Sequence, residues 1–391
     1  MNRYADFVIK HRKIITAVFV LAAVAGLFLR LGVKVNYNLV DYLPSSAPST
    51  KALEIMNEEF DQSIPNASVM VRDVSLTEAL QYKERLNAID GVSSVIWLDD
   101  VLDVKVPLET QDSNSVEEFY KDGNALFSVT IDPGIETKAV NAIREVIGEG
   151  NAITGEAPDK SYMESAAESE VLSAVVILLP IILIILILST TSWLEPLLFL
   201  IAIGVSILLN MGTNVFFGEI SFVTNSVSPI LQLAVSLDYA IFLLHSFADY
   251  RKECKDVEEA MRLAIKKSAS AVAASATTTL FGFIALVFME MGIGADLGIN
   301  LAKGILFSFV SCMVFLPALT LCVVKLLDKS RHRDLLPSFS NVNRFLRKLA
   351  FPALVLVLIL VVPGYLGQAS TEFTYGMTDE NPESRNWQEN H

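Results

Sequence analysis

Long apolar runs alternate with polar stretches along this chain of 391 residues. Seven of these runs approach or exceed the ~20 residues that a helix needs to cross the hydrocarbon core of a bilayer. They cover residues 14–33, 171–189, 194–217, 220–247, 269–289, 301–326 and 349–367. The pattern therefore predicts a membrane α-helical bundle of about seven transmembrane helices.

The first run admits two interpretations. Its stretch LAAVAGLFL is typical of the hydrophobic region of a cleaved signal peptide that ends at small residues. The run nevertheless continues to Val33, which is long for a signal peptide and favours a retained anchor.

The polar insertion at residues 34–170 has a pattern of its own. Four stretches, NASVMVRD, GVSSVIWL, NALFSVTID and NAITG, have the composition of strands, while TEALQYKERLNAI and GIETKAVNAIREVIG indicate helices. Their order is strand–helix–strand, an interruption, and strand–helix–strand again, which predicts an α+β ferredoxin-like domain. The stretch DKSYMESAAESEVLSAVV then predicts a helix that runs from this domain directly into the membrane.

Charge is concentrated in the same insertion. The chain has a formal net charge of −14, and residues 34–170 hold 26 acidic against 10 basic residues. So acidic a surface argues against a nucleic-acid partner. The three cysteines, Cys254, Cys312 and Cys322, all lie outside the insertion, which excludes a disulfide-stapled external domain.

Basic residues predict the orientation of the chain. Clusters of Lys and Arg precede the first run, separate the fourth run from the fifth, and separate the sixth from the seventh. The positive-inside rule places all three clusters in the cytoplasm. We therefore expect a cytoplasmic N-terminus, an extracytoplasmic domain at residues 34–170, and an extracytoplasmic segment after Gly367.

An aspartate, Asp238, stands inside the fourth run, in the stretch LAVSLDYAIFLLHSF. A charged side chain at mid-bilayer costs roughly 2.5–3.5 kcal/mol on insertion scales, and such residues usually mark ion or proton pathways. A carboxyl group that gains and releases a proton, beside the hydroxyl of Tyr239, is suited to a proton relay. The alternative is a structural hydrogen-bonding group that holds helices together.

Possible relay neighbours come from two runs. Helical spacing in the fourth run gives Gln232, Ser236 and His245, and the threonines Thr277 and Thr278 of the fifth run could reach Asp238 from the next helix. For the threonines, bonds to carbonyls of their own helix are the alternative. We further expect Asp296 to cap the sixth span, Lys303 to extend towards the membrane surface, and Asn210 and Asn214 to support helix packing. No metal-binding motif such as C-x-x-C or H-E-x-x-H occurs.

A weak internal repeat predicts how the chain is divided. The stretch VKVNYNLVDYLPSSAPSTKA follows the first run, and the similar TEFTYGMTDENPESRN follows the seventh. Repeated halves are common in transporters. We therefore expect an N-terminus with the first span (1–33), an extracytoplasmic domain (34–170), spans two to six (171–326), a cytoplasmic linker (327–348), a seventh span (349–367) and the truncated start of a second extracytoplasmic domain (368–391). A natural half-transporter that pairs with itself is the alternative.

The membrane blocks also resemble a known family. SPILQLAVSLDYAIFLLHSFADYRKE resembles the fourth-span signature of the MMPL branch of the RND (resistance-nodulation-division) superfamily, with its Asp-Tyr pair. The block EEAMRLAIKKSASAVAASATTTLFGFIALVFMEMGIGADLGINLAKGI and the FLPAL at 315–319 are similar to the segments that follow in that family. The resemblance is strong over residues 194–326, and it covers the external domain only by position and coarse pattern.

This resemblance implies two halves of six spans, each with an external porter domain, in a bacterial plasma (inner) membrane. It implies proton-driven export of lipids or other hydrophobic or amphiphilic compounds, with Asp238 and Tyr239 as the first of two Asp-Tyr pairs. The second pair would come from a half missing from this chain, or from another protomer.

We expect a transporter and no enzyme, since the sequence has no nucleophile-and-base constellation and no phosphate-binding glycine loop. We expect no cofactor beyond the proton gradient, and sodium coupling is the alternative, because a carboxylate among Ser and Thr residues suits either ion. A non-transporting lipid-sensing or accessory membrane protein of the same fold is the second candidate.

Overall fold

The computed structural model describes residues 2–59, 64–332 and 340–371. Within these residues, seven helices are long and apolar enough to cross a membrane, in agreement with the seven predicted spans. They are α2 (Arg12–Arg30), α8 (Glu156–Ser189), α9 (Glu195–Gly212), α10 (Phe222–Glu253), α11 (Val257–Leu286), α12 (Gly292–Val310), which continues through a π-helical turn at Ser311–Phe315 into α13 (Leu316–Lys329), and α14 (Ser340–Ala369).

A side-chain cap begins α10, and a close contact between glycines joins α9 to α2. The Ser221 side chain accepts a hydrogen bond from the Thr224 N–H at 3.1 Å and so begins α10. Gly212 of α9 lies against Gly26 of α2, where a Cβ on Gly212 would stand 2.4 Å from the Gly26 carbonyl oxygen. Only glycine allows the two backbones to approach so closely.

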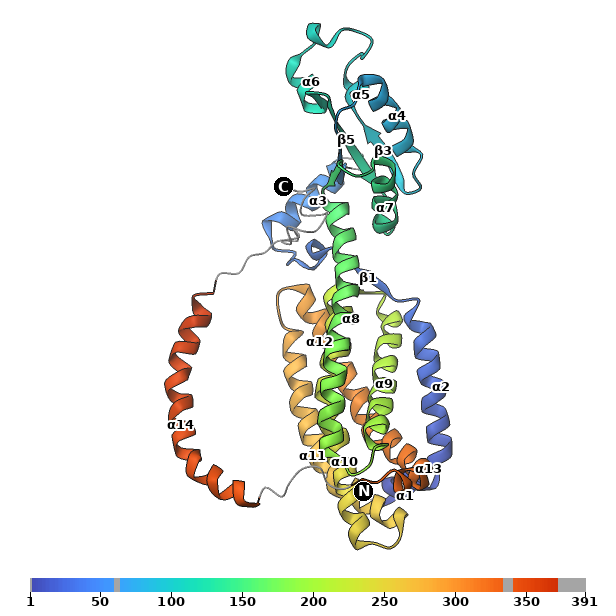
Figure 1. Cartoon of the computed structure of the whole chain (residues 1–391), viewed down its shortest axis with the longest axis vertical. Helices are drawn as coiled ribbons and strands as arrows, with labels where there is room; N and C mark the ends of the chain where they lie inside the picture. The colour runs from blue at the N-terminus through green and yellow to red at the C-terminus, as the bar shows by residue number, and fades with distance from the viewer. Residues whose placement is uncertain (1, 60–63, 333–339, 372–391) are drawn as a thin grey trace.

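A small α/β unit lies beyond one end of the bundle (Figure 1). Its strands are β2 (Ala67–Val71), β3 (Val92–Ile96), β4 (Tyr120–Lys121), β5 (Asn124–Ile131) and β6 (Ala152–Thr154), and its helices are α4 (Leu76–Asn87), α5 (Leu98–Val101), α6 (Ser113–Phe119) and α7 (Glu136–Ile147). The strand order is β3-β5-β2-β6 with every neighbouring pair antiparallel, and β4 pairs with β5. All six predicted strands and helices are present, and alternate residues such as Val69, Phe127 and Val129 form a buried core with Trp97 and Ile143.

Helix α8 joins the α/β unit to the bundle without a break, as the sequence predicts (Figure 1). Its 34 residues extend about 50 Å at 1.5 Å per residue. The Lys160 ammonium of α8 lies 2.5 Å from the Glu136 carboxylate of α7, and this carboxylate also accepts from the Gly134 N–H at 2.8 Å. The Thr137 hydroxyl donates to the Glu164 carboxylate of α8. These polar contacts fix α7 to the upper part of α8.

An ion-pair cluster holds α4 against α5. The Lys83 ammonium lies 2.7 Å from the Asp99 carboxylate and 2.6 Å from that of Asp100. Burial raises the pKa of the Asp100 carboxyl, but the hydrogen bonds from Lys83 and from the Trp97 N–H outweigh it, and the net pKa lies below the ordinary value of 3.8. The cluster therefore favours the ionised carboxylate in the folded state.

Short segments connect these parts. They are α1 (Asn2–Lys10), α3 (Pro48–Glu59), the 3-10 turns Leu39–Tyr42, Leu108–Thr110 and Thr213–Phe217, and the parallel pair of β1 (Lys34–Asn36) with β7 (Glu219–Ser221). The β1–β7 pair ties the start of the external segment to the start of α10. At the opposite end of the bundle, the Tyr4 hydroxyl of α1 donates to the Met313 carbonyl at 2.7 Å.

Helix α14 stands apart from the other helices (Figure 1). Each of its side chains from Leu349 to Ala369 is exposed. Part of the predicted linker at 327–348 lies outside the described residues, as does nearly all of the predicted second domain at 368–391. The second copy of the weak repeat therefore also lies outside them.

Candidate functional site

Asp238 and Tyr239 lie halfway along α10 and point in different directions. Asp238 is exposed, and in the described part of the chain its carboxylate has no hydrogen bond or ion pair. Tyr239 is only 2% exposed, and its hydroxyl has no hydrogen-bond partner among the described residues, although Ser275 and Thr279 of α11 lie near it. Successive residues of a helix are turned by about 100°, so the carboxylate of Asp238 faces the outer surface of the bundle and the hydroxyl of Tyr239 faces its interior.

The rest of the predicted polar stripe of α10 is built into the core of the bundle. The Gln232 amide nitrogen donates to the Gly304 carbonyl and to the Ser308 hydroxyl, both at 3.1 Å, and its oxygen accepts from the Asn210 amide at 3.0 Å. The Ser236 hydroxyl donates to Ser308 at 2.6 Å. Gln232 and Ser236 thus connect α10 to α9 and α12, while the carboxylate of Asp238 faces outwards.

Asparagines extend this network along the helices. The Asn300 side-chain oxygen accepts from Ser228 at 2.8 Å and from Asn210 at 3.1 Å, and its nitrogen donates to Asn214 at 2.7 Å. At Gly304 a Cβ would stand 2.8 Å from the Asn210 amide nitrogen, so a larger residue would displace the network. The i, i+4 spacing of Ser206 and Asn210 in α9 and Asn214 in the 3-10 turn that follows is a sequence signal that could have indicated this buried polar stripe.

The structure corrects one expectation for α12 and gives the contacts of a second residue. The Lys303 ammonium donates to the Asn210 carbonyl at 3.0 Å and to the Asn214 side chain, and it lies 4.8 Å from the centre of the exposed Phe217 ring. Asp296 does not cap its own helix. Its carboxylate accepts from the Ser221 N–H at 2.8 Å and from the Thr224 hydroxyl at 2.6 Å, and so stabilises the N-terminus of α10.

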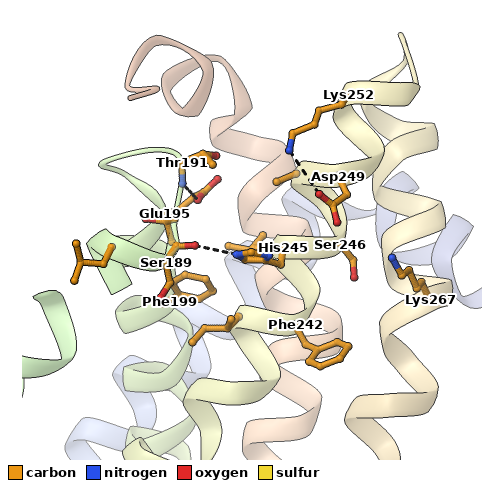
Figure 2. A pocket seen from close by; sticks show the side chains of 15 residues that line it. Ser189, Thr191, Glu195, Phe199, Phe242, His245, Ser246, Asp249, Lys252 and Lys267 are labelled. Atoms are coloured by element: carbon orange, nitrogen blue, oxygen red, sulfur yellow. Dashed lines mark hydrogen bonds and ion pairs between the residues drawn. The ribbon is translucent and has the colours of Figure 1, made fainter. Parts of the chain in front are cut away.

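The other possible relay neighbours are spread over the bundle. Thr277 and Thr278 are exposed on α11, and the Thr278 hydroxyl donates at 3.0 Å to the Ala274 carbonyl of its own helix rather than to Asp238. His245 lies near the far end of α10, and its Nε2 is 2.9 Å from the Ser189 carbonyl oxygen (Figure 2). Because a carbonyl can only accept, Nε2 carries a proton.

His245 also lines a cavity of about 690 Å³ at the end of the bundle away from the α/β unit. Its lining comes from the end of α8, the start of α9, and facing parts of α10 and α11 (Figure 2). The buried carboxylate of Glu195 is part of this lining and was missed from the sequence, because an acidic residue beside a proline at the start of a run is typical of a helix N-terminus.

Residues 41–348 match the MMPL family model, a region that includes the α/β unit, α8 to α13 and the Asp-Tyr pair. The chain belongs to the MMPL family. With seven candidate spans, it is a multi-pass membrane protein of that family.

Several named membrane and transport proteins are similar to this chain. A putative membrane protein ActII-3 of Streptomyces coelicolor is 25% identical over 327 residues, which are 77% of this chain and 44% of that protein. A putative membrane protein MJ1562 of Methanocaldococcus jannaschii is 36% identical over 89 residues, 23% of each chain. The sulfolipid-1 exporter MmpL8 of Mycobacterium tuberculosis is 30% identical over 89 residues, 23% of this chain and 8% of that protein.

The chain thus spans less than half the length of these curated relatives that it matches. Of these three names, that of MmpL8 states a transport role, the export of sulfolipid-1, and the other two state a membrane protein.

Proposed function

We propose that this chain is the N-terminal part of an exporter of lipids or other amphiphilic compounds that is driven by the proton gradient. Asp238 and Tyr239 form half of its proton relay. The observation that carries this proposal is the pair itself, a carboxylate exposed halfway along a membrane helix next to a buried hydroxyl that has no hydrogen-bond partner among the described residues.

A membrane helix does not keep an unpaired carboxylate against lipid without cost. The penalty of roughly 2.5–3.5 kcal/mol is removed if the group is protonated, or if another polar surface covers it. A second bundle of the same kind, with its own Asp-Tyr pair, would provide that surface for Asp238, whereas the hydroxyl of Tyr239 lies inside this bundle near Ser275 and Thr279. Helix α14 also supports a second half. Its side chains from 349 to 369 are all exposed, and the helices of a second half would cover part of them.

The α/β unit is proposed to be a ferredoxin-like porter domain. The strand order β3-β5-β2-β6, with α4 and α7 following the first and third of its strands in the chain, supports that assignment. The contact of Lys160 with Glu136 couples this domain to α8, so a tilt of α8 within the membrane would move the domain. Protonation of Asp238 would bias that tilt through the packing of α10 against α8.

The positions of the basic clusters support an N-terminus in the cytoplasm and a porter domain outside it, in a bacterial plasma membrane. In the described part of the chain, Arg12 pairs with Glu258 and Arg262 with Asp6, so the basic residues of two clusters meet at the same end of the bundle. The proposed substrate is a membrane lipid or another amphiphile, and the second transporter half or another protomer is the proposed partner.

The test is an efflux assay of Asp238→Asn in the complete two-half protein, with a gradient imposed across proteoliposomes. We expect flux to fall to background while the melting temperature changes little, because Asn keeps the shape of a side chain that has no partner to lose. Glu253→Gln, which removes an exposed carboxylate at the end of the same helix, is the matched control. Wild-type flux in Asp238→Asn would exclude the relay, whereas joint loss of folding and flux would indicate a structural role.

The coupling ion is tested separately. A proton gradient alone should drive flux with sodium equal on both sides, and a sodium gradient alone should not. The opposite result would assign the carboxylate to sodium.

A further inference from the structure

The cavity beside His245 extends along α10 from the end of the bundle towards the middle of the helix (Figure 2). Among the residues of α10 that line it, Lys252 is nearest the end of the helix and Ile241 is nearest its middle. Ile241 lies three residues after Asp238, a separation of about 4.5 Å along the axis at 1.5 Å per residue. The cavity therefore begins within one helical turn of the proposed relay carboxylate.

One exposed face of α10 connects Asp238 with this cavity. Asp238, His245 and Asp249 are all exposed, and their spacing of seven and then four residues places them on the same side of the helix. The cavity has a volume of about 690 Å³ and several polar walls, so it has room for water that hydrogen-bonds to these side chains. Such water can pass a proton between groups that do not touch.

The imidazole of His245 has one nitrogen engaged by the protein. Its Nε2 donates to the carbonyl of Ser189, the last residue of α8, at 2.9 Å. Nδ1 is then the acceptor of the neutral ring, and it has no hydrogen-bond partner in the part of the chain that the structure describes. A proton taken up at Nδ1 makes the ring a cation at the C-terminal end of α8, where the partial negative charge of the helix attracts it.

A buried carboxylate lies near this imidazole. Glu195, at the start of α9, is 6% exposed, and one of its oxygens accepts from the Thr191 N–H at 3.0 Å. Among the described residues its other oxygen has no hydrogen-bond donor, and the Glu195 carboxylate is close enough to His245 for their charges to interact. A buried carboxylate that keeps one oxygen free attracts a cation. An imidazolium at His245 would be such a cation.

Further charged groups surround the same space. Those that line the cavity or act on Glu195 from the elements packed around it are Asp249 and Lys252 of α10, Lys267 of α11, and Arg331 and His332 beyond α13. The Lys252 nitrogen lies 3.7 Å from the Asp249 carboxylate at the rim. The basic groups repel an imidazolium, whereas the carboxylates attract it, so the surroundings suit a ring that both gains and releases a proton. Histidine is the side chain whose ordinary charge change falls between about pH 5 and 8.

We propose that His245 and Glu195 form the proton-release site of the relay, at the cytoplasmic end of the pathway that begins at Asp238. The O–H bond of the Asp238 carboxyl group breaks, water in the cavity carries the proton, and an N–H bond forms at Nδ1 of His245. Glu195 is a positioning residue that holds the imidazolium by its charge. The Nδ1–H bond then breaks and the proton passes Asp249 into the cytoplasm. Asp238 is left as a carboxylate and His245 as a neutral ring, and no electrons are transferred.

The inference rests on the proposed function, both for the proton at Asp238 and for the cytoplasmic side of the cavity. The two are nevertheless distinguishable, because different variants test them. Wild-type flux in Asp238→Asn would remove the relay and its release site together. Loss of flux in Asp238→Asn with no change in His245→Gln would remove the release site alone.

The test is efflux from proteoliposomes of the two-half protein, with the pH difference held constant while the pH on the cytoplasmic side is set between about 6 and 8. His245→Gln keeps a donor for the Ser189 carbonyl but cannot carry the proton. We expect its flux to fall about tenfold or more and to lose the dependence on cytoplasmic pH that His245 causes. Imidazole added on the cytoplasmic side should restore flux in His245→Ala, because the free base can occupy the space of the missing ring.

Glu195→Gln keeps an acceptor for the Thr191 N–H and removes the charge. It should move the midpoint of the cytoplasmic pH dependence down by about 0.5–1 pH unit, because an imidazolium that loses an opposite charge gives up its proton at lower pH. A side chain with only a structural role would lower flux without moving this midpoint.

Two controls alter matching groups outside the cavity. His11→Gln removes a ring whose Nδ1 also lies against a backbone carbonyl oxygen, that of Phe7 at 3.1 Å. Glu253→Gln removes an exposed carboxylate near the end of α10. Both variants should keep wild-type flux and its pH dependence.

Wild-type flux and pH dependence in His245→Gln would overturn the proposal, and so would an unmoved midpoint in a folded Glu195→Gln protein. Melting curves check the fold of each variant. If Glu195→Gln unfolds, titration of His245 by nitrogen-15 NMR in the full chain replaces it. A His245 ring that stays in one protonation state between about pH 5 and 8 would equally overturn the proposal.

Discussion

Replacing Tyr239 by Phe separates function from stability at the proposed relay. The Tyr239 side chain is one of the largest fully buried groups in the bundle, and it packs in a core with Leu243 and Met313. Phe has the same ring and lacks only the hydroxyl. The substitution therefore keeps the packing and removes the one group that we propose acts in proton transfer.

The expected change in stability follows from the missing partner of that hydroxyl. A buried polar group without a hydrogen bond costs about 1–3 kcal/mol, and hydrogen bonds in membrane bundles contribute on average only about 0.6 kcal/mol. Tyr239→Phe should therefore leave the free energy of unfolding unchanged or raise it by about 1 kcal/mol. Gln232→Leu is the contrast, because it breaks four hydrogen bonds inside the bundle and should cost about 2–3 kcal/mol.

The assay combines unfolding in detergent micelles with efflux from proteoliposomes of the two-half protein. We expect Tyr239→Phe to unfold like the wild type and to lose most of its flux. Gln232→Leu should have a lower free energy of unfolding than the wild type. A loss of more than 1 kcal/mol in Tyr239→Phe would show that its hydroxyl has a structural partner. Full flux with unchanged stability would remove Tyr239 from the relay.

Three further changes test how the parts are held together. Gly212→Ala places a Cβ against the backbone of α2, which cannot give way, and should lower the free energy of unfolding in micelles by about 1–3 kcal/mol. Glu136→Gln weakens the contact with Lys160, so hydrogen exchange at the α7–α8 junction should rise and flux should fall. Asp100 has a pKa below its ordinary value of 3.8 in the folded state, so the stability from its pair with Lys83 is present above that value and is lost as the pH falls through the folded pKa. In Asp100→Asn, protection of α4 from exchange, corrected for intrinsic rates, should lose this acid dependence, and an unchanged profile would contradict the assignment.

Local patterns in the sequence were sufficient for the elements and for the family. The seven spans follow from length and hydropathy, and the strands and helices of the α/β unit follow from alternation and amphipathic spacing. The continuous α8 was predictable too, because no glycine interrupts residues 156–189, Pro158 lies in the first turn of the helix, and Pro180 lies within an apolar run. Each of these properties depends on residues a few positions apart.

The amino-acid sequence is therefore sufficient for the membrane class, the number of spans and the presence of a carboxylate within one of them. Tertiary packing sets the directions in which Asp238 faces out and Tyr239 faces in, because the face of a helix is inner or outer only once its neighbours are placed. The same holds for Asp296, which binds the start of α10 some 72 residues away, and for Lys303, which binds Asn214 across 89 residues. These contacts join side chains from different helices, and a pattern along one helix does not specify which groups will meet.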